Sequence, residues 1–319
     1  DTITQIGYEE MANITLLSIQ LFNLKGEAIG RSRAGADLYL AIHAWMHKIP
    51  GGLGIANVFA CALFAAMAGS SPATCCAIGG AGIPEMRSRG YSPGFAAGII
   101  AAGGTLGILL PPSITMILFA VAAEQSLGRL FLAGIFPGLL LVGLFAGYAV
   151  FRFKVEYNSA LDVWHSGGAK SAYLDEMKMT RADKTRMLPR VIPFVLLLIG
   201  VMAALYGGYA TPSETAGLGG ILALALIAGI YGVWRPAQLK PILNSTLKES
   251  TMLMFIIGMS LLYSYVMSYL HISQSAAEWI VAMHLSKWLL LAAILVFVIV
   301  LGFFLPPVSI ILMTAPIIL

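Results

Sequence analysis

Charged residues are scarce in this sequence. Only 11% of its 319 residues are Asp, Glu, Lys or Arg, whereas 59% are hydrophobic. A soluble globular domain carries about 25% charged residues, so this composition excludes a soluble globule and indicates an integral membrane protein. Apolar segments near the length of ~20 residues that crosses a bilayer recur along the chain. They span 12–24, 51–84, 94–123, 130–151, 191–206, 213–233, 250–270 and 288–319.

Regular alternation of apolar and polar residues is also missing, which excludes the strands of a membrane barrel and leaves helices as the way to satisfy the backbone in lipid. Cysteine is rare as well. Cys61, Cys75 and Cys76 lie in apolar surroundings without metal-ligand spacing, which predicts a packing role. The first residues show no cleavable signal peptide.

Acidic residues are absent from the apolar segments 51–84, 94–123, 130–151, 191–213, 215–234, 250–277 and 288–319. Proton-coupled pumps usually carry carboxylates or histidines within the membrane. Their absence favours a coupling ion that neutral oxygens can hold. It also disfavours a membrane-embedded enzyme, because no nucleophile with a base and no set of metal ligands lies at membrane depth.

The segment 65–80, AAMAGSSPATCCAIGG, places turn residues inside an apolar run. Gly69-Ser70-Ser71-Pro72 predicts a chain reversal, so 51–84 is expected to form a helical hairpin that enters and leaves the membrane on one side. With that hairpin, a loop with Lys25, Arg31, Arg33 and Lys48 is expected on the same side of the membrane as all other lysines and arginines except Arg129 and Lys287. The positive-inside rule makes that side the cytoplasm, and the hydrophilic stretch Arg152 to Arg190 becomes a cytoplasmic loop.

An internal repeat accompanies the hairpin. ADLYLAIH at 36–43 and AEWIVAMH at 277–284 share the same spacing of Ala, acid and His, and an interrupted apolar run follows each copy. The charge distribution puts the two copies on opposite faces, which predicts an inverted repeat with one hairpin entering from each side. The segments 34–49 and 272–286 are expected to be amphipathic arm helices, with His43 and His284 interfacial rather than metal-bound. Leu38, Ile42 and Trp45 form the predicted apolar stripe of the first arm.

A broken crossing follows the first hairpin. In 98–120, GIIAAGGTLGILLPPSITMILFA, both Gly103-Gly104 and Pro111-Pro112 are expected to unwind the helix. Interrupted segments in matching halves point to the midplane site of a secondary transporter. An ordinary proline kink is the structural alternative.

The stretch PGGLGIANVFACALFAAMAGSSPATCCAIGGAGIPEMRSRGYSPGFAAGIIAAGGTLGILLPPS resembles the large membrane (M) subunit of tripartite ATP-independent periplasmic (TRAP) transporters of the C4-dicarboxylate type. GYATPSETAG and GFFLPPVSIILMTAPIIL resemble two further landmarks of that family in the same order. The resemblance covers essentially the whole chain. The segment LSIQLFNLKGEAI departs from the family pattern, and its Gln20 and Asn23 share one helix face.

The resemblance implies an all-α, polytopic, elevator-type secondary transporter of the bacterial inner membrane, driven by sodium ions and without enzymatic activity or another cofactor. It implies three partners: a small four-helix membrane (Q) subunit, a periplasmic substrate-binding (P) protein and an organic acid such as a dicarboxylate or sialic acid. Apart from the lipid bilayer, no further partner such as nucleic acid is implied. It also implies further helices before residue 1 and after Leu319.

The expected organisation has four parts. Residues 1–49 form a scaffold helix and the first arm, and 50–123 form a transport domain with the first hairpin and the broken helix. Residues 124–287 form scaffold helices with the loop 152–190 and the second arm, and 288–319 begin the second hairpin. Thr211-Pro212-Ser213-Glu214 predicts a helix-capping box.

The predicted site consists of hydroxyls and unwound carbonyls for sodium and of half-helix N-termini for a substrate carboxylate. Its candidate residues are Ser70, Ser71, Thr74, Gly103, Gly104, Thr105, Gly107, Pro111, Pro112 and Ser113, with Pro306, Pro307 and Ser309 from the second hairpin. The structural alternative is that these hydroxyls bond to their own helices or join two helices. At the level of function, a transporter of the same architecture that works without a binding protein and a passive channel are the other possibilities.

Overall fold

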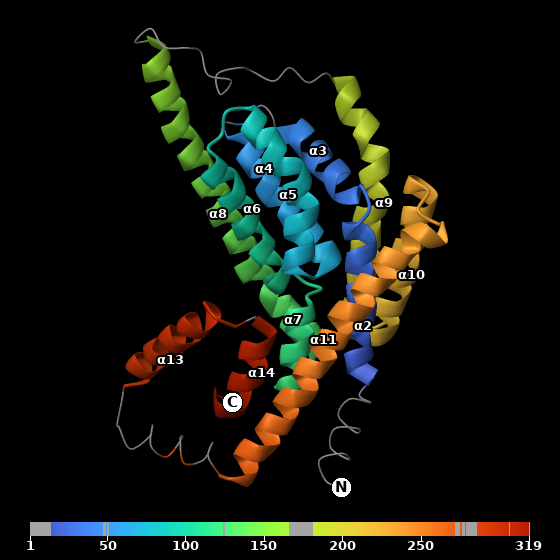
Figure 1. Ribbon diagram of the computed structural model, residues 1–319, viewed down its shortest axis with the longest axis vertical. Helices are drawn as coiled ribbons and strands as arrows, with labels where there is room; N and C mark the ends of the chain where they lie inside the picture. Colours follow the sequence, from blue (N-terminus) through green and yellow to red (C-terminus); the bar gives the residue numbers. More distant parts are fainter. Residues whose placement is uncertain are drawn as a thin grey trace.

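A computed structural model describes residues 14–46, 49, 51–123, 125–165, 181–271, 275, 278, 286–305 and 307–318. Within these ranges every regular element is a helix (Figure 1). Three of the described helices are long and apolar enough to cross a membrane: α8 (Leu127–His165), α10 (Pro212–Tyr231) and α11 (Pro236–Tyr269). A bent pair, α6 (Pro93–Leu109) with α7 (Ile114–Ala122), makes a fourth when it is counted as one span. The all-α architecture expected from composition is confirmed.

The first hairpin has the predicted position. Helix α4 (Gly52–Ala68) ends at Gly69, which has a left-handed φ of 66°, and α5 (Ser71–Ser88) runs back along it after the extended Ser70. Pro72 lies in the first turn of α5, where its missing N–H is not needed. Both helices pack against α6, and the tip of the hairpin lies near the middle of the long axis of the molecule (Figure 1).

A second group of helices surrounds α2 (Ile14–Gly30), which packs most extensively against α10 and also contacts α11. Helix α9 (Arg181–Tyr206) covers α10 and α3 (Ala34–Met46). The predicted capping box starts α10: the Glu214 amide donates to Thr211 Oγ1 at 3.3 Å, and the Thr211 amide donates to Glu214 Oε2 at 2.8 Å. This prediction is confirmed.

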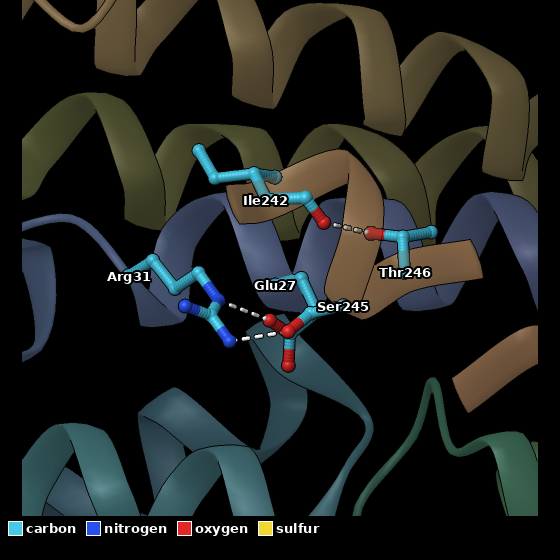
Figure 2. A network of polar contacts seen from close by, with 5 residues as sticks. All are labelled: Glu27, Arg31, Ile242, Ser245 and Thr246. Atoms are coloured by element: carbon cyan, nitrogen blue, oxygen red, sulfur yellow. Dashed lines mark hydrogen bonds and ion pairs between the residues drawn. The ribbon is translucent and has the colours of Figure 1, made fainter. Parts of the chain in front are cut away.

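Polar side chains join α2 to α11 (Figure 2). The guanidinium of Arg31 donates to Glu27 Oε2 at 2.7 Å and to the hydroxyl of Ser245 on α11. One turn deeper, Asn23 Nδ2 donates to Ser250 Oγ at 3.4 Å. The departure at Asn23 from the family pattern therefore has a structural use, because the amide pairs with a neighbouring helix.

The position of Lys25 corrects one prediction. The charge count treated Lys25 as part of a cytoplasmic loop, but the residue belongs to α2 and its side chain is only 1% exposed. Its Nζ lies 4.7 Å from the centre of the Phe22 ring, and its stem passes beside Gly219 of α10. A long aliphatic stem can pack in an apolar interior while an aromatic face stabilises the charged end. The charge of Lys25 therefore did not require a loop, and the prediction was wrong.

Helix α3 forms over the predicted first arm but differs from a simple amphipathic helix. Asp37 and His43 are buried together with Leu38, whereas Trp45 of the predicted apolar stripe is 59% exposed. The reason is that α3 runs between the hairpin and α9, with protein on both sides (Figure 1). Most of the second arm, including His284, lies outside the described residues.

The predicted loop 152–190 is shorter than expected. Helix α8 continues to His165, and α9 begins at Arg181; the residues between them are outside the described ranges. Glu156 extends the helix, because its carboxylate lies 3.3 Å from Arg152 one turn earlier and accepts from Ser92 Oγ at 2.8 Å. Local ion pairs of this kind stabilise a polar helical turn that hydropathy alone reads as a loop.

The second predicted hairpin begins with α13 (Lys287–Gly302), a turn, and α14 (Pro307–Ile318). Helix α14 packs beside α7 and α11 (Figure 1). The described structure thus has a helix–turn–helix where the interrupted apolar run predicted one, while Pro306 itself lies outside the described residues.

Candidate functional site

The glycine pair in α6 corrects a second prediction. Gly103 and Gly104 do not unwind the helix, since α6 is continuous from Pro93 to Leu109. They allow close packing instead: a Cβ at Gly103 would lie 2.8 Å from Cys61 of α4, and one at Gly104 would overlap the sulfur of Cys75 of α5. A glycine costs a helix only about 1 kcal/mol relative to alanine, so tight packing can outweigh it.

The three cysteines are free thiols. Cys61 is fully buried and Cys75 is half-buried, with its Sγ 3.6 Å from the Ile100 carbonyl oxygen of α6. These two have the predicted packing role. Cys76 is exposed on α5 and lies outside that interface.

The proline pair breaks the helix as predicted. Residues Leu110 to Ser113 separate α6 from α7, the peptide bond between Pro111 and Pro112 is cis, and the two helices are bent by 40°. All four residues of the break are buried. Non-helical backbone at membrane depth is tolerated when protein surrounds it, and the hairpin provides that surrounding here.

The tip of the hairpin contacts the break directly. The Ile114 amide donates to the Gly69 carbonyl at 3.3 Å, and a Cβ at Gly69 would lie 2.7 Å from the Pro112 carbonyl oxygen. On the other side, a Cβ at Gly107 would lie 2.8 to 3.0 Å from backbone atoms of Ser70 and Ser71. Glycine is required at both positions for the backbones to approach this closely.

Four helix ends therefore meet at one place. The C-terminal end of α4 and the N-terminal end of α5 form the tip, and the C-terminal end of α6 and the N-terminal end of α7 form the break. The N-terminal ends carry partial positive charge and the C-terminal ends partial negative charge. The arrangement offers amide groups to an anion and carbonyl groups to a cation without any ionised side chain.

The candidate hydroxyls divide into two kinds. Thr74 Oγ1 donates to the Ser70 carbonyl at 2.8 Å, and Ser113 Oγ donates to the Ile108 carbonyl at 2.6 Å. Both are fully buried, and these bonds fit the structural alternative, although each oxygen keeps lone pairs for an ion. Ser70 and Ser71 are half-buried, and Ser70 makes no side-chain cap bond to α5.

Thr105 and Pro307 lie in a different environment. Thr105 is exposed on α6, donates to the Ala102 carbonyl at 2.6 Å and shares a cavity of about 520 Å³ with Pro307 of α14. The lining is almost entirely apolar and includes Thr115, which sequence reasoning did not select. Ser309 is half-buried one turn into α14.

Sequence reasoning also missed two backbone contacts of the tip. One is the amide of Ile114, whose partner is the Gly69 carbonyl. The other is Gly26 of α2, where a Cβ would lie 2.6 Å from the Ala68 carbonyl oxygen. The side chain of Ile114 is apolar and Gly26 has none, so residue chemistry gave no signal of either contact.

Long apolar helices with a helical hairpin and a broken helix define a multi-pass membrane protein. Comparison with known families adds the particular family. Residues 1–319 match the family described as the tripartite ATP-independent periplasmic transporter, DctM component, and the chain belongs to it. The resemblance seen in the sequence is confirmed.

Individual relatives agree with this assignment. The chain is 35% identical to the C4-dicarboxylate TRAP transporter large permease protein DctM of Pseudomonas aeruginosa, over 97% of this chain and 69% of the relative. It is 32% identical to the protein of the same description from Rhodobacter capsulatus, over 99% and 72%. A sialic acid TRAP transporter large permease protein SiaM of Vibrio cholerae is 25% identical over 95% and 68%.

Proposed function

We propose that this chain is the translocating membrane subunit of a sodium-coupled secondary transporter that imports an organic acid across the bacterial inner membrane. It works with a small membrane subunit and receives its substrate from a periplasmic binding protein. The hairpin and the broken helix form the part that moves, in an elevator mechanism, against the helices around α2. Membership of the TRAP family supports the division of labour among three subunits.

One observation carries the proposal: the tip of the first hairpin meets the break between α6 and α7. The Ile114 amide donates a hydrogen bond to the Gly69 carbonyl oxygen at 3.3 Å. Carbonyl groups at the tip and the break, together with the hydroxyls of Ser70 and Ser71, are the oxygen ligands expected for sodium. The N-termini of α5 and α7 are the partners expected for a carboxylate, each contributing ~0.3–1 kcal/mol, and up to ~2 kcal/mol when partly buried. Relatives named for C4-dicarboxylates and for sialic acid support a carboxylate as the substrate class.

Reconstitution of the complete transporter in vesicles tests the proposal. Uptake of the acid should require a sodium gradient, stop when potassium replaces sodium, and speed up with an inside-negative potential. A net charge moved inward gains ~2.3 kcal/mol per 100 mV. Uptake that persists without sodium and ignores the potential would contradict sodium coupling, and uptake that persists without the binding protein would favour a transporter that works alone.

A further inference from the structure

Lys25 places a buried cation in the group of helices around α2. Its side chain is 1% exposed, and a Cβ at Gly219 of α10 would lie 3.5 Å from its Cδ, so the glycine leaves room for the stem. The Nζ atom lies 4.7 Å from the centre of the Phe22 ring, whose face stabilises a cation. The packing around Lys25 therefore accommodates both the length and the charge of this side chain.

No acid forms an ion pair with Lys25 in the part of the chain that the structure describes. The acid nearest in sequence, Glu27, pairs with Arg31 on the side of α2 that faces α11. Glu249 of α11 lies on that same side, beside Asn23. A buried charge without a counter-ion is costly, and ionised side chains inside membrane proteins usually serve transport. The charge of Lys25 therefore needs a functional explanation.

Packing alone does not require this charge. The stem of Lys25 contacts apolar surroundings, and a methionine of similar length would fill the same space. Replacement of a buried charge by an apolar side chain of similar volume is often neutral or stabilising. The contact between α2 and α10 would therefore persist without the ammonium group.

The charge lies close to the hairpin tip and the broken helix. The next residue of α2 is Gly26, where a Cβ would lie 2.6 Å from the Ala68 carbonyl oxygen at the tip. The Phe22 ring, which faces the Lys25 ammonium, belongs to the same buried cluster as Ile114 at the start of α7. The tip and the break carry no ionised side chain of their own. A charge on α2 therefore acts on this site without an opposing charge within it.

We propose that Lys25 is a specificity-determining residue: its fixed positive charge strengthens binding of the substrate carboxylate at the hairpin tip and weakens binding of sodium alone. Coulomb interactions act through space and are screened much less inside a protein than in water, so direct contact is not required. The inference rests on the proposed function, in which the tip binds sodium and a carboxylate.

The sign of the effect differs for the two ligands. A sodium ion without its anion is repelled, which disfavours a state that would carry sodium inward without substrate. For one sodium ion together with one carboxylate, the repulsion and the attraction offset each other. Lys25 thus favours the site when it is empty or doubly occupied over the site that holds sodium alone.

Lys25→Met tests the charge in the complete transporter. With sodium as the probe and no acid present, the sodium concentration for half-maximal thermal stabilisation should fall about tenfold, because a like charge has been removed. Lys240→Met removes an exposed charge from α11 and is the matched control, with the sodium concentration expected to stay unchanged. Equal sodium concentrations in Lys25→Met and in the unmodified protein would overturn the proposal.

A carboxylate probe measures the opposite effect. Succinate is a C4-dicarboxylate, the class named for two of the relatives. At saturating sodium, the succinate concentration for half-maximal further stabilisation should rise at least about tenfold in Lys25→Met, because the anion loses an attractive charge. A packing defect would weaken both ligands, so shifts of sodium and succinate in the same direction would overturn the proposal.

A second variant decides the question even if Lys25→Met inserts poorly. Gly219→Asp places a carboxylate beside the Lys25 stem, where a Cβ would lie 3.3 Å from Val201 Cγ2 and 3.5 Å from Lys25 Cδ. The lysine remains but its charge is neutralised, so the sodium concentration should again fall about tenfold. Gly219→Ser is the steric control, since its side chain is small and uncharged. Equal sodium concentrations in the two Gly219 variants would overturn the proposal.

The two proposals fail separately. Sodium-driven uptake, together with unchanged sodium concentrations in Lys25→Met and Gly219→Asp, would remove the role of Lys25 and leave the proposed function intact. An unmodified protein that sodium does not stabilise, together with weaker succinate binding in Lys25→Met, would remove sodium coupling and leave the effect of Lys25 on the anion.

Discussion

The backbone amide of Ile114 donates a hydrogen bond to the carbonyl of Gly69 across 3.3 Å, and this contact joins the tip of the first hairpin to the first residue of α7. The first amides of a helix have no partner inside the helix, so the tip satisfies one of them. This contact and the close approach of Gly69 to the Pro112 carbonyl hold the tip against the broken helix. Hairpin and broken helix should therefore move together as one unit.

Gly69→Ala should destabilise this unit. The left-handed backbone at Gly69 costs an alanine about 1–2 kcal/mol, and the contact of its Cβ with the Pro112 carbonyl oxygen adds ~1–3 kcal/mol. Gly208→Ala separates the two effects, because Gly208 has a φ of 69° but no atom within 4 Å of a Cβ. Thermal unfolding in detergent should show a larger loss for Gly69→Ala, and equal losses would mean that the contact with Pro112 contributes nothing.

Gly107→Ala should separate the hairpin from α6. A Cβ at Gly107 meets backbone atoms of Ser70 and Ser71, which cannot rotate away, so the expected cost is about 1–3 kcal/mol. Gly98→Ala on the same helix has no atom within 4 Å of the Cβ and serves as the control. Thermal stability and sodium-dependent uptake should fall only for Gly107→Ala. Unchanged uptake in that variant would argue against a site at the hairpin tip.

Ser70→Ala and Ser71→Ala should each weaken sodium binding. Both side chains are half-buried at the tip, and each substitution removes one oxygen while it keeps the turn compact. The sodium concentration for half-maximal uptake should rise about tenfold, or ~1.4 kcal/mol, at matched membrane expression. Ser88→Ala at the other end of α5, where the hydroxyl bonds to the Glu85 carbonyl, is the control. If both tip variants behave like Ser88→Ala, the serines have no part in ion binding.

Tyr231→Phe should loosen α3 from α10. The lost hydrogen bond to the Asp37 carboxylate is of the charged type, which contributes ~1.5–3 kcal/mol. The phenylalanine ring keeps the stack on Phe194, so the effect isolates the hydroxyl. Tyr209→Phe, with a side chain that is 88% exposed, controls for loss of a phenol. Hydrogen exchange of the amides of α3 should increase in Tyr231→Phe alone, and equal exchange in both variants would contradict the tether.

Labelling with an impermeant thiol reagent tests the inverted arrangement. Arg87 lies at the open end of the first hairpin and Lys287 begins α13, and both side chains are exposed. In a background without the three native cysteines, Arg87→Cys should react from the cytoplasmic side and Lys287→Cys from the periplasmic side. Reaction of both from one side would exclude the inverted repeat.

The features predicted well from sequence are those that depend on a residue's own covalent structure. The adjacent Pro111 and Pro112 both lack an N–H and interrupt the helix where the sequence predicted it, and the turn around Gly69 follows from residues that favour a reversal. The capping box at Thr211 and Glu214 is likewise local, since both partners lie within one turn.

The features predicted poorly depend on distant neighbours. Gly103 and Gly104 were expected to unwind α6, but Cys61 and Cys75 pack against them and the helix continues. Lys25 was expected in a loop, but α10 and the Phe22 ring cover it. In both cases the residue type allows two outcomes, and the packing partner selects one.

Composition, prolines and short motifs act locally, so the membrane class, the family and the places where the chain turns or breaks could be predicted without a structure. Which backbone groups meet at the hairpin tip, and which glycines face the hairpin from α2 and α3, depends on the packing of whole helices. These contacts join residues far apart in the chain, such as Gly69 with Ile114 and Gly35 with Ala77, and their main-chain atoms carry no signal in the residue types. Glycine permits close helix packing at many positions in the chain. The surrounding helices bring two backbones that close together at only a few of them.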